Sequence, residues 1–117
     1  MVLSEEELEG FHGGGHRNLV FKDAYQKKAT SFTLMPGDAL HFPVTAPHWV
    51  QNCDQVSISF SITFRSAYSE RAAKLYYLNS KIRKLGLAPT PPGSVSWRDN
   101  LKYGAFKMAL SAKHALG

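Results

Sequence analysis

The 117-residue sequence predicts a mainly β fold that ends in C-terminal helices. One observation is the segment 56–64, where apolar residues occupy every second position and Ser or Thr stands between them. This alternation is typical of a strand with one apolar face. Other short β-like runs before residue 65 are separated by turn residues. After residue 65, apolar residues recur at helical spacing instead.

Residues 1–16 carry few signals of ordered structure. The stretch 5–8 can form a helical turn, but three glycines follow at positions 13–15. Because glycine loses much conformational entropy on ordering, these residues end any regular element. We therefore expect a poorly structured N-terminal segment over 1–16.

The next part of the chain, 17–65, holds the predicted strands. Pro36 and Gly37 predict a turn, because proline fixes φ at the first central position and glycine supplies a positive φ at the second. The predicted strands are 18–21, 31–34, 39–42, 48–51 and 56–64.

The last part, 66–117, is predicted to form two helices. Ser66 or Ser69 caps the first helix, which ends near Gly86. A linker with three prolines follows. The second helix begins at Ser96, with Asp99 in the position of a capping box.

Composition bounds the class of protein and its compartment. The sequence is 44% hydrophobic and 20% charged, as in ordinary globular domains. No apolar run approaches the roughly 20 residues of a membrane span, so we expect no membrane partner. The acidic N-terminus shows no signal peptide. Cys53 is the single cysteine, which excludes an intrachain disulfide, and a cytoplasmic location is expected.

The charge balance is basic, with 14 Lys and Arg against 9 Asp and Glu. Such an excess invites a nucleic-acid function. However, the acidic residues gather between positions 5 and 9, and the basic ones spread over the later helical stretches. A solvated helix face explains the basic residues between 74 and 84 more simply than a phosphate track does. We do not expect a nucleic-acid partner, and keep a small basic nucleic-acid-associated regulator as an alternative function.

The most informative stretch is 37–52, in which Gly37, Pro43, His48 and Asn52 stand at fixed spacing. This pattern resembles the second conserved motif of the cupin superfamily, although Thr45 stands where glycine is usual. The Pro-Gly-Asp turn and the run Pro-His-Trp-Val are most similar to JmjC-like cupins. The resemblance covers the C-terminal half of such a domain. It implies a partial cupin-like jelly-roll β-barrel, with a β-half-barrel over 17–65, followed by two α-helices.

The resemblance also implies a metal-ligating role for His48, as the last protein ligand of Fe(II) or another divalent metal, with 2-oxoglutarate as co-substrate. Other ligands in the family come from a His-x-Asp/Glu or His-x-His pair, whose members share one face of a strand. Neither pair occurs in this sequence. A facial triad needs two histidines and one carboxylate, so His48 alone does not hold iron. His12 and His16 are the alternative replacement ligands.

These observations predict a truncated or degenerate JmjC-like cupin domain without independent catalysis. It would act as a binding or assembly module, or as part of an Fe(II)/2-oxoglutarate-dependent oxygenase. The alternative is a metal-dependent cupin oxygenase whose site is completed between subunits. Exposed strand edges and the C-terminal helices predict a homodimer, because a half-barrel leaves edges and apolar surface uncovered.

Overall fold

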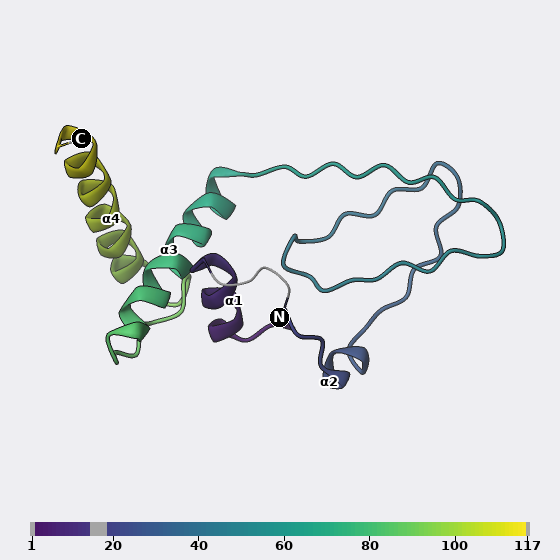
Figure 1. Cartoon of the computed structure of the whole chain (residues 1–117), viewed down its shortest axis with the longest axis horizontal. Coiled ribbons are helices and arrows are strands. Elements are labelled where there is room, and N and C mark those ends of the chain that lie inside the picture. Colours follow the sequence, from purple (N-terminus) through teal and green to yellow (C-terminus); the bar gives the residue numbers. More distant parts are fainter. Residues whose placement is uncertain (1, 15–18, 117) are drawn as a thin grey trace. The chain divides into compact units, whose positions relative to one another are not determined.

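The computed structural model describes residues 2–14 and 19–116, and the elements in these ranges are helices (Figure 1). The helices are α1 (Glu5–His12), α2 (Asp23–Gln26), α3 (Ala67–Lys84) and α4 (Ser96–Leu116). No residue in the two described ranges belongs to a β-strand. The prediction of a mainly β fold is therefore wrong, and the described part of 17–65, residues 19–65, does not form the expected cupin-like jelly-roll half-barrel.

The predicted strands lack the hydrogen bonds that make a sheet. Among the described residues, backbone hydrogen bonds outside the helices are all local and join residues at most five positions apart. A strand exists only where a neighbouring strand donates and accepts along a ladder. The alternation of apolar and hydroxyl residues over 56–64 shows which side chains would share one face of a strand. It does not supply the neighbouring strand.

The chain divides into two compact units, which we call the extended unit and the helical unit. The extended unit contains the described residues up to Leu3 together with 20–64, and the helical unit contains 4–14, Leu19 and 65–116. None of the helices in the described part of the chain is both long enough and apolar enough to cross a membrane.

The extended unit has little regular structure, and its clearest feature is a turn. The N–H of Asp38 donates to the carbonyl of Met35 at 2.9 Å, and Gly37 has a φ of 97°. The carboxylate of Asp38 accepts a hydrogen bond from the N–H of Met35 at 2.8 Å. The turn predicted from Pro36 and Gly37 is thereby confirmed.

Helix α1 starts with a capping box within the segment 1–16. The hydroxyl of Ser4 accepts from the N–H of Glu7 at 3.2 Å, and the carboxylate of Glu7 accepts from the N–H of Ser4 at 2.8 Å. Acidic residues in the first turn also favour the positive end of the helix dipole. Local capping chemistry therefore explains why a helix forms here.

Helix α3 has the predicted boundaries. The hydroxyls of Ser66 and Ser69 each accept the other's backbone N–H, at 3.1 and 2.9 Å. At the other end, the N–H groups of Gly86 and Leu87 donate to carbonyls of the last helical turn, as in a Schellman motif. The cap and the end near Gly86 are both confirmed.

Helix α4 begins at Ser96 as predicted, but its start is held differently. The carboxylate of Asp99 accepts a hydrogen bond from the N–H of Gly93 at 2.7 Å. The backbone N–H of Asp99 donates to the carbonyl of Val95. Asp99 therefore ties the linker to the helix, and the predicted capping-box pairing of Ser96 with Asp99 is not formed.

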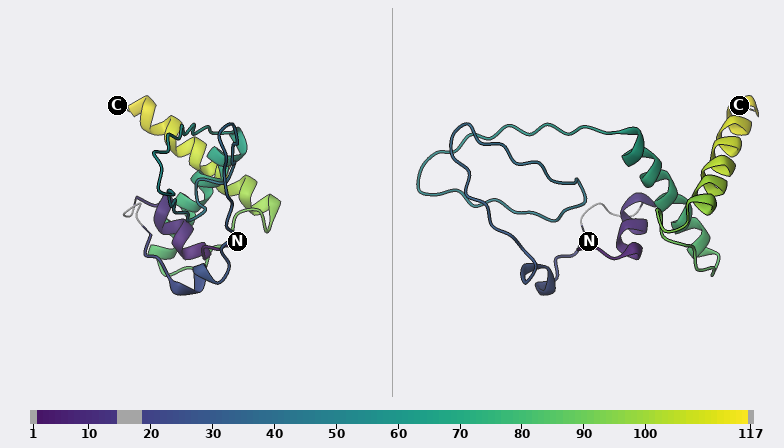
Figure 2. Two further views of the ribbon diagram at one scale, coloured as in Figure 1. Left: turned by 90° about the vertical axis from the view of Figure 1, so that its right-hand side faces the viewer. Right: turned by 180° about the vertical axis from the view of Figure 1, so that it is seen from behind.

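Helix α1 packs on α3 (Figure 2). A small apolar core and a partly buried ion pair join the two helices. Leu8 of α1 and Leu75 and Tyr76 of α3 are the apolar side chains buried here. Glu9 is only 2% exposed, and Arg83 donates to both of its carboxylate oxygens, at 2.6 and 3.1 Å. A buried carboxylate is costly unless it is paired, so the position of α1 depends on Arg83.

The close approach of α1 to α3 also requires glycine at position 13. A Cβ added there would lie within 2.8 Å of the Ser80 side chain and of the carbonyl oxygen of Glu9. Gly13 is therefore a packing residue as well as the end of α1.

A polar cluster joins α3 to the linker and to α4. Asn79 is 0% exposed; its amide donates to the carbonyl of Thr90 at 2.9 Å and accepts from the ammonium of Lys102 at 2.8 Å. Lys102 also donates to the carbonyl and the hydroxyl of Thr90, at 2.9 and 3.2 Å. Three segments of the chain therefore meet at the Asn79 amide.

We expect Asn79→Ala to lower the free energy of unfolding of the helical unit by about 2–4 kcal/mol, because it leaves a cavity and removes two buried hydrogen bonds. Chemical denaturation followed by helical circular dichroism measures this change. The matched control is Asn100→Ala, since Asn100 is exposed and accepts one hydrogen bond from Arg71. That control is expected to change stability by less than about 1 kcal/mol.

Candidate functional site

His48, the predicted metal ligand, is an exposed residue of the extended unit. Its Nδ1 donates to the carbonyl of Ala46 at 3.1 Å, and its ring lies 4.4 Å from the ring of Phe42, measured between centroids. This arrangement leaves Nε2 of His48 as the ring nitrogen able to act as a ligand.

The structure does not bring other ligand types to His48. Within residues 2–14 and 19–116, no group of three His, Cys, Asp or Glu side chains is placed to hold a metal ion. His41 stacks on Phe64 with ring centroids 5.4 Å apart, and Cys53 is exposed. His16, one of the two alternative ligands, lies outside the described residues. Iron and 2-oxoglutarate therefore stay predictions of the resemblance.

His12, the other alternative ligand, lies in the last turn of α1 within the helical unit. Its ring stacks on Tyr76 of α3, with centroids 5.6 Å apart and planes 12° from parallel, and it meets the edge of Phe11. Burial lowers the pKa of His12 from its ordinary value of 6.5, because the charged imidazolium is poorly solvated there. His12 therefore acts as an aromatic packing residue between α1 and α3.

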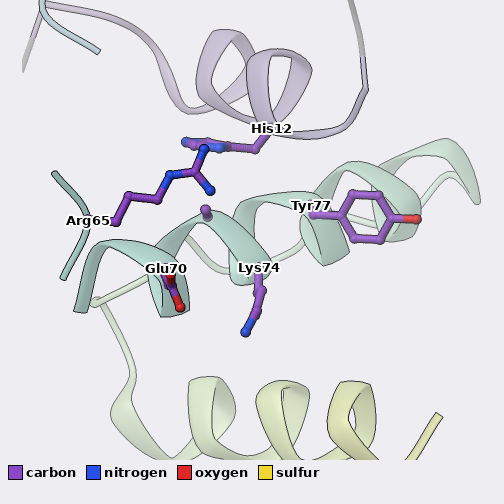
Figure 3. Close-up of a pocket in the computed structure, with 6 residues that line it drawn as sticks. His12, Arg65, Glu70, Lys74 and Tyr77 are labelled. Carbon is purple, nitrogen blue, oxygen red and sulfur yellow. The ribbon is translucent and has the colours of Figure 1, made fainter. Parts of the chain in front are cut away.

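An open cavity of about 370 Å³ lies beside His12 (Figure 3). Arg65 reaches under the imidazole from the segment just before α3, and Lys74 and Tyr77 project from α3 (Figure 3). The cavity is lined by His12, Arg65, Glu70, Ala73, Lys74 and Tyr77. Two permanent cations and one carboxylate give this lining a net positive charge, which suits an anionic group.

The sequence alone did not predict the cavity, although the helical spacing of three of its lining residues is visible there. Glu70, Lys74 and Tyr77 follow one another at spacings of four and three residues, which places them on one face of a helix. Arg65 stands two residues before α3, whereas His12 joins them only because α1 packs on α3, and that contact depends on the pairing of Glu9 with Arg83.

Comparisons with protein-family models, with curated proteins and with solved structures find no match for this chain.

The pKa of His12 predicts a pH dependence of stability. The folded pKa lies below the unfolded value, so the unfolded chain binds a proton more readily. Neutral His12 contributes fully above about pH 6.5, and the stability of the helical unit falls as the pH drops through the folded pKa. Denaturation midpoints between pH 7.5 and pH 5 measure this loss, which His12→Phe is expected to reduce. An unchanged slope in His12→Phe would assign the pH dependence to other groups.

Proposed function

We propose that this chain is a binding and assembly module that associates with a second copy of itself. The observation that carries the proposal is the exposure of one long apolar segment. Val56, Ile58, Phe60, Ile62 and Phe64 are between 70% and 95% exposed. An apolar run of this kind, free of charge and of proline, is costly to leave in water and marks an interaction surface.

The pattern of this segment favours an identical partner. In an antiparallel pair centred on Phe60, Phe60 faces Phe60 of the second copy, Ile58 faces Ile62 and Val56 faces Phe64. All five apolar residues then lie on one face, and the intervening Ser and Thr residues lie on the other. Facing side chains of this type stabilise strand pairs, and such a two-fold contact is self-complementary, as in most homodimers.

Other registers match less well. A shift of one residue would set apolar side chains opposite hydroxyls, because successive side chains point to opposite faces. A shift of two residues in one direction pairs Phe64 with Asp54, and in the other direction it pairs Val56 with Ser66. The register centred on Phe60 is the one that gives every apolar side chain an apolar neighbour.

Strand pairing needs support from a second surface. Five facing pairs at about 0.2–1 kcal/mol each contribute at most about 5 kcal/mol. Association costs about 4–15 kcal/mol, because the two chains lose translational and rotational freedom. Helix α4 supplies the additional area. Trp97, Leu101 and Met108 are 64–70% exposed and share one face of α4. Burial of this stripe supports a dimer that also uses the C-terminal helices.

A charge exchange at position 60 tests both the dimer and its register. We expect the unmodified chain to sediment as a dimer at micromolar concentrations in analytical ultracentrifugation. Phe60→Lys and Phe60→Glu should each be monomeric, because residue 60 would face an identical charge. An equimolar mixture of the two variants should recover a dimer, since Lys then faces Glu.

Ser59→Lys is the matched control, because it places the same charge on the hydroxyl face and should still dimerise. Circular dichroism verifies that the helices are retained in all variants. A monomeric unmodified chain would contradict the proposed function. A dimer that survives Phe60→Lys would reject pairing through 56–64 and leave α4 as the contact.

A further inference from the structure

Three cationic side chains converge on one aromatic ring where α3 meets α4. The guanidinium of Arg71 and the ammonium groups of Lys74 and Lys107 lie 5.1, 5.8 and 5.2 Å from the centre of the Tyr103 ring. Arg71 and Lys74 come from α3, whereas Tyr103 and Lys107 come from α4. We call these four residues the basic cluster.

The basic cluster holds unneutralised positive charge. Because the three cations surround the same ring, any two of them lie within about 11 Å, close to the Debye length of about 10 Å at 0.1 M salt. None of the three forms an ion pair with a carboxylate among the described residues. Arg71 instead donates to the neutral side chain of Asn100 at 2.6 Å. Cation–π contact with Tyr103 holds the charges together and leaves them available to an anion.

The surrounding sequence strengthens the positive field. Between residues 65 and 117, ten Lys and Arg residues stand against Glu70 and Asp99, and the carboxylates of Glu6 and Glu9 on α1 lie against Arg83 rather than against the cluster. Lys74 also lines the cavity that contains Arg65 and His12. The basic surface therefore continues from the cluster into the cavity, where Glu70 is the single carboxylate among the described lining residues.

The geometry distinguishes between classes of anionic partner. Anionic membranes and protein surfaces are bound by apolar anchors together with charge. The exposed apolar stripe of α4 includes Leu101 and Met108, which lie more than a quarter turn around the helix from Tyr103 and Lys107 at 100° per residue. On the cluster's own face of α4, Leu110 is the exposed large apolar side chain, at 40%, so charge dominates the cluster and one apolar side chain flanks it. Nucleic-acid backbones are bound by such charge alone.

We propose that the basic cluster and the neighbouring Lys74 side of the cavity bind the phosphate backbone of a nucleic acid. Arg71, Lys74 and Lys107 contact phosphates, and Arg65 extends the same surface. This function is independent of self-association through 56–64, because all of these residues belong to the helical unit.

Fluorescence anisotropy of a labelled single-stranded DNA, titrated with the full chain at several salt concentrations, tests the proposal. We expect Lys74→Gln and Lys107→Gln each to weaken binding about two- to tenfold and to reduce the slope of log affinity against log salt by about one. Glu70→Gln should strengthen binding about twofold, because it removes the carboxylate beside Lys74. This opposite change cannot result from loss of folding.

Lys84→Gln is the matched control, since Lys84 lies ten residues beyond Lys74 on α3, about 15 Å along the helix axis. It removes the same charge away from the cluster and should leave the salt slope nearly unchanged. Equal affinities for Lys74→Gln, Lys107→Gln and Lys84→Gln would overturn the proposal. It would also be overturned if polyglutamate, or vesicles of anionic phospholipid, displaced the DNA as well as unlabelled DNA does.

Discussion

The arrangement of the helical unit depends on the buried amide of Asn79. Few apolar side chains are buried in this unit, so polar contacts set the relative positions of its helices. Asn79 and Lys102 both donate hydrogen bonds to Thr90, which fixes the linker against α3. These bonds also set the position of α4 relative to α3. Tyr103 follows Lys102 directly on α4. The position of the basic cluster is therefore a consequence of the hydrogen bonds among Asn79, Thr90 and Lys102.

Local signals in the sequence predict the elements that are stabilised by residues close to one another in the chain. The serine pair that caps α3, its end near Gly86 and the turn at Met35–Asp38 each depend on residues within a few positions of one another. Contacts between distant residues were not predictable in the same way. Glu9 and Arg83 are separated by 74 positions, and nothing in either local sequence indicates the pairing. The sequence predicts Gly13 only as a helix breaker, because its close approach to Ser80 exists only once α1 has packed on α3.

The mainly β prediction was wrong because a sheet depends on the pairing of two segments, which the pattern of one segment does not show. Alternation over 56–64 is a real property of the sequence, but a sheet needs a second strand at hydrogen-bonding distance. The same limit applies to the candidate site. His48 fits the spacing of the motif, yet a metal centre requires further ligands that converge from elsewhere, and none converge on it within the described residues. In contrast to His48, the basic residues do converge: Arg71 and Lys107 lie far apart in the sequence but meet at Tyr103 once α3 and α4 pack.

The two proposed contacts have different physical origins, so salt separates them. Self-association buries the apolar side chains of 56–64 and of α4, and burial of apolar surface is not weakened by added salt. Phosphate binding releases counterions and weakens steeply as salt rises. Because the basic cluster lies on a different face of α4 from its apolar stripe, one chain has room for both contacts. A second copy would then double the number of cationic surfaces on the assembly, and two linked sites bind a long nucleic acid more tightly than one does.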